Sequence, residues 1–153
     1  MDGGSWADIN APIDTVFAIV ADIELLPQWH SDVELAECLE RDPAGRVQVL
    51  RLVLETMIRR TEVSLRLSYV EPTIVSWTME EGNVQGFEGS WTLLARPKGV
   101  TRASYAVSID FGRKLGFLLR GPGARALGDA AVSSLPRKLK AFVEQSTAVP
   151  TRS

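Results

Sequence analysis

The chain has 153 residues, a formal net charge of −2 and one cysteine, and 45% of its residues are hydrophobic. These totals predict a single domain in the reducing cytoplasm that folds without disulfides or a structural metal. The acidic balance argues against a general nucleic-acid binder. We expect neither a secretory signal nor a membrane span, because no basic-then-apolar start and no sufficiently long apolar run is present.

The first thirty residues predict a short strand followed by two short helices. Residues 5–9 (SWADI) have the composition of a strand. A helix is predicted to follow, with Asn10 or Ala11 as its N-cap and Pro12 at its first helical position. Its buried face recurs at helical spacing and comprises Ile13, Val16, Phe17 and Val20. A second helical piece at 23–31 is predicted to be interrupted by Pro27.

Six strand-like runs fill the middle of the chain, at 33–42, 45–57, 59–70, 73–81, 86–97 and 100–111. The joints between them are too short for parallel crossovers, so the strands should pair antiparallel in sequence order. Alternation is clearest in three runs, whose core-facing sets are Val63, Leu65, Leu67 and Tyr69; Phe87, Trp91 and Leu93; and Ala103, Tyr105, Val107, Ile109 and Phe111. Within the second run, residues 47–57 are apolar on both phases, which leaves the two faces of that run unassigned.

A final amphipathic helix is predicted at about 122–145, with an apolar stripe of Leu127, Ala131, Leu135, Leu139 and Phe142. Pro136 should kink or split this helix near 132–135. It is the only predicted element long enough to cover the apolar face of the sheet. The expected fold is α+β: a seven-stranded curved antiparallel sheet wrapped around a long C-terminal helix, in one domain at 1–146 with a frayed tail at 147–153.

Three stretches resemble the helix-grip superfamily of START and Bet v 1-like (SRPBCC) proteins, and its polyketide cyclase/dehydrase branch in particular. They are INAPIDTVFAIVADIELLPQWHSDV (9–33), YVEPTIVSWTMEEG (69–82) and FEGSWTLLARPKGVTRASYAVSID (87–110). Together they cover nearly the whole chain, roughly residues 8–145. The resemblance implies an internal cavity between the sheet and the last helix that takes up an apolar or aromatic small molecule. The same fold carries enzymes, carriers and receptors, so the resemblance specifies the fold more closely than an activity.

The resemblance to aromatase/cyclases also implies a catalytic arginine, which aligns with Arg66. Strand alternation places Arg66 on the outer face instead, unless a one-residue bulge reverses the phase. A second arginine of that family has no counterpart here, where Met79 and Glu80 stand, and Leu26 occupies a position that is usually aromatic.

Further candidate residues gather around the only histidine, His30, which is either a general base or a structural residue. Trp29 beside it is either a cavity wall or a core plug. Glu55 is either a polar group of the cavity or a solvated strand charge. Leu119 lies in a glycine-flanked segment that is either a lid or a packed loop. The expected ligand-binding set is Trp29, Glu55, Trp77, Met79, Phe87, Trp91, Tyr105 and Leu119, with Arg66 and His30 as catalytic candidates.

The leading hypothesis is therefore binding of a hydrophobic or aromatic small molecule, with polyketide-type cyclisation or dehydration as the reaction if the chain is an enzyme. The alternatives are a non-enzymatic lipid or quinone carrier and a protein-interaction module on the same fold. We expect no cofactor, no metal and no nucleic-acid partner, and a monomer or homodimer. The sequence lacks a glycine-rich phosphate loop, a Cys/His cluster and a serine nucleophile turn, which argues against hydrolases and metal enzymes.

Overall fold

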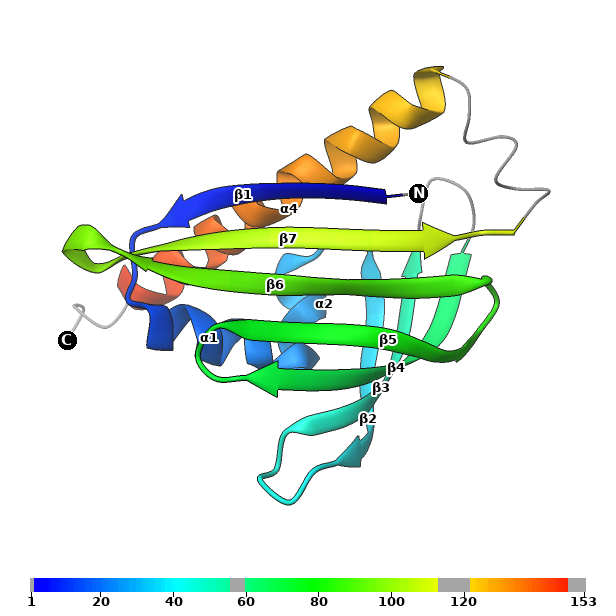
Figure 1. Cartoon of the computed structure of the whole chain (residues 1–153), viewed down its shortest axis with the longest axis horizontal. Coiled ribbons are helices and arrows are strands. Elements are labelled where there is room, and N and C mark those ends of the chain that lie inside the picture. Colours follow the sequence, from blue (N-terminus) through cyan, green and yellow to red (C-terminus); the bar gives the residue numbers. More distant parts are fainter. Residues whose placement is uncertain (1, 56–59, 113–121, 149–153) are drawn as a thin grey trace.

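A seven-stranded antiparallel sheet and one long helix form the two main layers of the molecule (Figure 1). The computed structural model describes residues 2–55, 60–112 and 122–148, and the side chains of 122–131 and 147–148 lie outside that description. The strands are β1 (Asp2–Ile9), β2 (Val33–Arg41), β3 (Val47–Glu55), β4 (Arg60–Val70), β5 (Ile74–Gly82), β6 (Gly86–Arg96) and β7 (Val100–Asp110). Their order in the sheet is β1-β7-β6-β5-β4-β3-β2, which confirms the predicted fold class.

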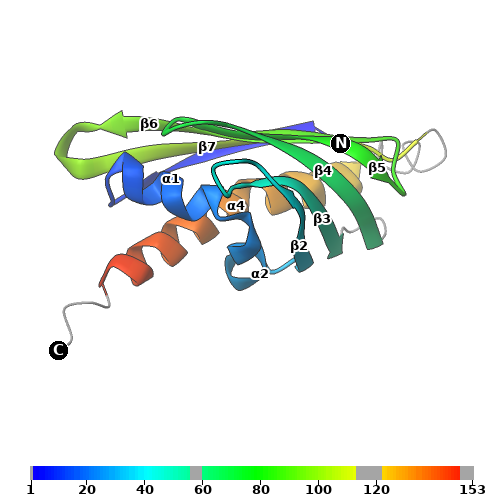
Figure 2. The same cartoon turned by 90° about the horizontal axis from the view of Figure 1, so that it is seen from below.

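The sheet is strongly curved, and Figure 2 shows β2, β3 and β4 bending toward the helices. Strands β2 to β7 pair with their sequence neighbours, because only a few residues separate each strand from the next along the chain. The turn between β6 and β7, Pro97–Gly99, places Lys98 at φ 65° and Gly99 at φ 71°, and glycine tolerates this backbone conformation without strain. The first strand, β1, pairs with the last strand, β7, and β1 is therefore one edge of the sheet.

Two short helical segments follow β1 and lie on the concave side of the sheet. α1 (Ile13–Ala21) begins directly after Pro12, and its buried residues are Val16, Phe17 and Val20. The 3₁₀ helix η1 (Ile23–Leu25) leads into α2 (Leu26–Trp29). Pro27 lies in the first turn of α2, where a missing N–H costs no hydrogen bond. The helical piece predicted at 23–31 is divided between Leu25 and Leu26 into η1 and α2, so the break lies just before Pro27 and this proline is accommodated in the first turn of α2.

Helix α4 (Pro122–Ala148) continues through Pro136 and is not split there, contrary to one of the two predicted outcomes. Proline has no N–H to donate to the carbonyl of Val132, four residues earlier. The Ser5 hydroxyl of β1 donates to that carbonyl at 2.8 Å, so the orphaned acceptor is satisfied across the two layers. Leu135 and Leu139 of the predicted stripe are buried and Phe142 is partly buried, whereas the side chains of Leu127 and Ala131 lie outside the description.

Strand alternation divides the sheet into a core face and an outer face as the sequence indicates. On β4, for example, Leu65 and Leu67 are buried and Arg66 between them is exposed. The two faces of β3 could not be told apart from the sequence because both are apolar and buried. Leu50, Leu52 and Leu54 belong to the central core, and Val49 and Val53 are buried outside it. A strand that is buried on both faces has no polar phase to detect.

Candidate ligand-binding cavity

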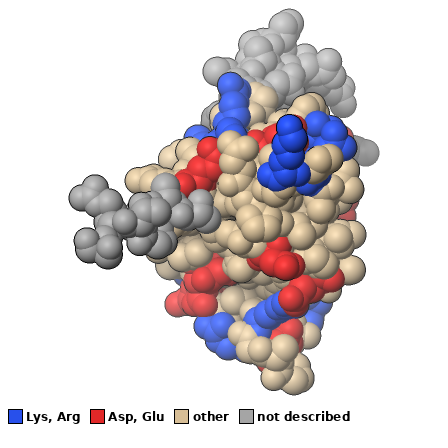
Figure 3. Space-filling view, turned by 90° about the vertical axis from the view of Figure 1, so that its left-hand side faces the viewer, with Lys and Arg blue, Asp and Glu red and all other residues tan. Residues whose placement is uncertain are grey.

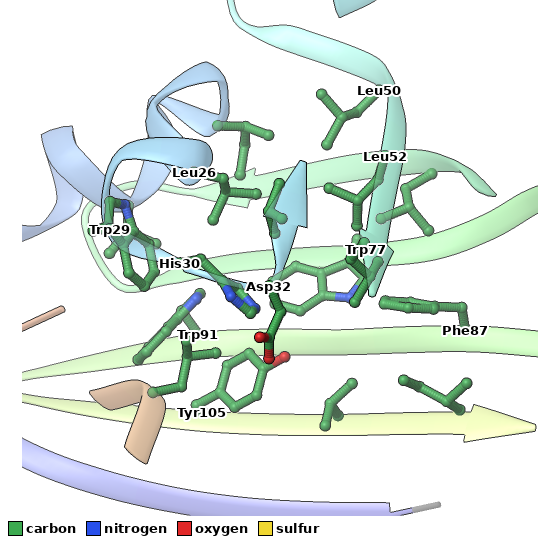
Figure 4. Close-up of a pocket in the computed structure, with 18 of the residues that line it drawn as sticks. Leu26, Trp29, His30, Asp32, Leu50, Leu52, Trp77, Phe87, Trp91 and Tyr105 are labelled. Carbon is green, nitrogen blue, oxygen red and sulfur yellow. The ribbon is translucent and has the colours of Figure 1, made fainter. Parts of the chain in front are cut away.

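A cavity of about 480 Å³ lies between the concave face of the sheet, the α1–α2 segment and α4. Its wall is mostly aliphatic and aromatic, and Figure 4 shows the side chains that enclose it. The described lining residues are Val20, Ile23, Leu26, Trp29, His30, Asp32, Val33, Leu50, Leu52, Leu54, Glu55, Leu65, Leu67, Trp77, Phe87, Trp91, Tyr105, Val107, Ile109, Val132 and Leu135. The curvature of the sheet keeps its core face from closing fully on α4, and the remaining space is the cavity.

Four aromatic rings form a continuous wall along this cavity. The centroids of Trp29 and Trp91 are 6.0 Å apart, those of Trp91 and Tyr105 4.8 Å, and those of Trp77 and Tyr105 6.0 Å. The rings come from α2, β5, β6 and β7, so only the folded sheet brings them together. We call these four residues the aromatic wall. Such a surface suits a flat ligand, because aromatic rings stack in offset or tilted arrangements at these distances.

Gly89 determines where the Trp77 indole lies. The two residues are paired across β5 and β6. A Cβ atom at Gly89 would stand 2.7 Å from Cζ2 of Trp77 and 2.6 Å from the carbonyl oxygen of Ala106. The absence of a side chain therefore lets the indole lie against the backbone of β6. Sequence reasoning did not select Gly89, although a glycine inside a strand opposite a tryptophan is a signal of close approach.

Three polar atoms of the cavity residues are buried and have no hydrogen-bond partner in the described protein. They are Nε1 of Trp29, Nε1 of Trp77 and Nδ1 of His30. Buried polar atoms are normally paired, so each unpaired one calls for an explanation. A ligand that supplied the missing partners would provide it.

Burial lowers the pKa of His30 to about 4, with a smaller lowering from Lys138, against the opposing effect of the Asp32 carboxylate. The imidazole is therefore neutral at pH 7. Burial also raises the pKa of the Tyr105 hydroxyl, which stays protonated and able to donate. The polar groups on the inner side of the cavity are consequently uncharged.

Two carboxylates stand where the cavity reaches solvent. Asp32 and Glu55 are the exposed members of the described lining. The backbone N–H of Glu55 donates to the Asp32 carbonyl at 2.9 Å, which fixes the two residues beside each other. An Arg60 nitrogen lies 3.6 Å from the Glu55 carboxylate and also pairs with Glu34. The described lining itself contains no lysine or arginine.

Seven of the expected site residues line the cavity: Trp29, His30, Glu55, Trp77, Phe87, Trp91 and Tyr105. Met79 packs against the core but is not in the lining. Leu119 lies outside the described residues. Sequence reasoning missed the lining contributed by Leu50, Leu52, Leu54, Val132 and Leu135, and it did not select Asp32 as a lining residue.

Arg66 is on the outer face, which corrects its expected place in the cavity. Its side chain is 46% exposed, and its Nε donates to Glu80 at 2.8 Å. The register between β4 and β5 does shift beside it, but the extra residue is Glu80 on β5, so the alternation of β4 is unbroken. A group that points away from the cavity cannot contact a ligand inside it.

The surface is otherwise mixed in charge. Acidic and basic side chains both occur across the described part of the face shown in Figure 3. Within the described ranges, no group of three or more His, Cys, Asp or Glu residues is arranged to hold a metal ion. None of the helices among these residues is both long and apolar enough to cross a membrane.

Solved structures share this architecture over nearly the whole chain. A START superfamily protein from Mycobacterium smegmatis superposes with a TM-score of 0.81 at 20% identity, covering 95% of this chain and 98% of that one. A protein from Thermus thermophilus gives 0.81 at 22% identity, with 96% and 99% coverage. The Zhui aromatase/cyclase from Streptomyces sp. R1128 gives 0.74 at 15% identity, with 98% and 97% coverage.

Identities this low establish the fold and leave the activity open. No curated protein sequence matches the chain. The family described as polyketide cyclase / dehydrase and lipid transport matches residues 9–135. That match includes the strands and α1–α2 segment around the cavity, and it shows that the chain belongs to this family.

Proposed function

We propose that this chain binds a hydrophobic, flat small molecule of polyketide-like or other aromatic type in its internal cavity. The observation that carries the proposal is an apolar space of about 480 Å³ whose lining residues include three with buried, unpaired hydrogen-bonding atoms. Cofactor and ligand sites occupy roughly 300–1,000 Å³ and combine apolar walls with a few polar groups. A ligand of two to four fused rings suits both the volume and the aromatic wall.

Any chemistry in this cavity would depend mainly on positioning. His30 is the lining residue best suited to proton transfer, and its neutral imidazole can accept a proton. With a pKa of about 4 it is a weak base at pH 7. Cyclisation or dehydration of a reactive chain would then rely on holding the reacting atoms close together within the apolar wall. Binding is therefore the primary proposal, and turnover rests on it.

A non-enzymatic carrier for a lipid or quinone is the second candidate. The observation that favours it is the outward position of Arg66, which leaves the described cavity lining without a cationic group for catalysis. A carrier returns its ligand unchanged. Incubation with a bound polyketide or quinone, followed by extraction and mass spectrometry, distinguishes the two candidates by whether the mass changes.

Native mass spectrometry of the purified protein, with denaturing extraction of bound molecules, tests the proposal. We expect a co-purifying apolar molecule, or uptake of one from a panel of polyketides, quinones and fatty acids. Leu52→Trp fills the cavity and should abolish uptake, because Leu52 is buried in its wall. Leu94→Trp is the matched control on the outer face, where Leu94 is 54% exposed. Equal uptake by both variants would contradict binding in the cavity.

A further inference from the structure

The polar groups of the cavity differ in position and in kind, and this difference bears on which ligands fit. The inner groups, on Trp29, His30, Trp77 and Tyr105, are uncharged, whereas the carboxylates of Asp32 and Glu55 stand at the opening. In the view of Figure 4, the side chains of His30 and Asp32 lie next to each other. Both sets belong to residues that line the cavity.

The inner groups favour an oxygen acceptor. An indole N–H can only donate, and Trp29 and Trp77 each bury one without a partner. Trp77 is 9% exposed and Trp29 is 8% exposed, so bulk water gives these donors little compensation. The Tyr105 hydroxyl can donate as well, and it makes no hydrogen bond to any of the described residues. An ammonium group has no acceptor lone pair and would leave these donors unpaired.

The opening disfavours an anion. A carboxylate ligand seated against His30 would lie near Asp32, whose charge already acts on that imidazole. Glu55 is held next to Asp32 by the backbone hydrogen bond between them. Like charges at short range in a partly desolvated site weaken binding, and Arg60 is shared between Glu55 and Glu34.

We infer that the cavity binds an uncharged aromatic ketone or quinone more tightly than a carboxylate of the same shape. The carbonyl oxygen of such a ligand accepts hydrogen bonds from the indole N–H of Trp77 and from neighbouring inner groups. The inference rests on the proposed function, and it narrows the ligand class within it. Fatty acids and aromatic acids are excluded as preferred ligands, although their apolar parts fit the wall.

Three naphthalene probes of nearly equal shape test this selection by calorimetry at pH 7. 2-Acetylnaphthalene offers a carbonyl, 2-ethylnaphthalene offers no acceptor, and 2-naphthoate is anionic. We expect the ketone to bind about 3- to 10-fold more tightly than the hydrocarbon, the gain from one or two buried hydrogen bonds. We expect 2-naphthoate to bind at least about tenfold more weakly than the ketone.

Three substitutions test which residues cause these affinity differences. Trp77→Phe keeps an aromatic ring but removes the N–H, so the ketone-to-hydrocarbon affinity ratio should fall toward one. Trp6→Phe makes the same change on the exposed outer face and should leave that ratio unaltered. Asp32→Asn should strengthen 2-naphthoate binding severalfold by removing the like charge.

The wild-type probe series is decisive even if a variant fails to fold. Equal binding of the ketone and the hydrocarbon, or binding of 2-naphthoate as tight as that of the ketone, would overturn the inference and leave the proposed function standing. Absence of binding by all three probes would overturn the proposed function and the inference with it.

Discussion

Polar groups on the outer face of the sheet have partners, whereas several on the inner face have none among the described residues. On the outer face, charged side chains are paired, as in the exposed pair Arg66–Glu80 at 2.8 Å and the half-buried pair Arg102–Asp8 at 2.9 Å. On the inner face, the polar atoms of Trp29, Trp77 and His30 are buried and unpaired. Exposed ion pairs contribute little to stability, whereas unpaired buried groups are costly. The inner groups are therefore the ones whose presence a bound ligand would explain.

Tryptophan shows the same contrast within one residue type. Trp6 is 57% exposed on β1, and the Arg102 guanidinium lies 3.9 Å from the centre of its ring. The other three tryptophans line the cavity. An aromatic residue thus indicates a binding wall only when its strand phase and partner strands turn it inward.

The largest expected effect on stability comes from a buried residue of α4. Leu139 is fully buried, and Leu139→Ala should lower the free energy of unfolding by about 2–5 kcal/mol through lost burial and a new cavity. Arg137→Ala, on the exposed side of the same helix, should change it by no more than about 0.5 kcal/mol. Urea denaturation measures both. Equal losses would mean that α4 does not cover the sheet as described.

The second effect concerns pH and the buried imidazole. The pKa of His30 is about 4 in the folded protein against an ordinary 6.5, so the unfolded state binds more protons between these values. Stability should fall as pH drops from 6.5 to 4, by at most about 3 kcal/mol from this residue. Asp32 and Lys138 are the charged groups that act on it.

His30→Gln isolates that contribution, because glutamine does not titrate. The difference in unfolding free energy between wild type and variant should change across this pH range and level off above it. A difference that stays constant from pH 7 to pH 4 would show that the imidazole titrates normally and is not buried.

A smaller effect is expected at the contact under Trp77. Gly89→Ala should cost about 1–3 kcal/mol and weaken ligand binding, because the new Cβ displaces the indole or the backbone of β6. Gly86→Ala in the same strand is the control, since its nearest neighbour would be Asp110 Cβ at an ordinary 3.6 Å. Thermal unfolding and tryptophan fluorescence report the two changes. Equal stability and fluorescence of the two variants would show that the Trp77 indole does not pack against Gly89.

The smallest effect is expected at Arg66. Arg66→Ala removes an exposed pair with Glu80 and should alter stability by about 0–1 kcal/mol. Binding and any turnover should be unchanged, measured against the cavity variant Leu52→Trp. Loss of binding or turnover in a folded Arg66→Ala protein would return this residue to the site.

Local patterns predicted the elements well and the cavity only in part. Alternation placed Leu65, Arg66 and Tyr105 on their faces because each strand has a single polar phase. It failed for β3, where both phases are apolar. Asp32 and Val132 were not selected, because their position in the lining depends on how distant elements meet.

The aromatic residues show the same limit. Strand alternation selected Trp91 and Tyr105 for the core face, yet the contacts among the four rings of the aromatic wall depend on the register of three strands and on α2. Met79 shares a strand with Trp77 but lies beyond the cavity, beside the shift in register between β4 and β5. A one-residue shift in strand register depends on tertiary packing, and the hydrophobic pattern of the sequence does not predict it.

The most direct test of the central claim uses the four indole N–H signals of ¹⁵N-labelled protein during titration with 2-acetylnaphthalene. Three tryptophans line the cavity, and Trp6 is a built-in control on the outer face. Binding in the cavity predicts shifts for Trp29, Trp77 and Trp91 and none for Trp6, with assignments from single Trp→Phe variants. A shift of Trp6 alone, or no shift at saturating probe, would contradict the account.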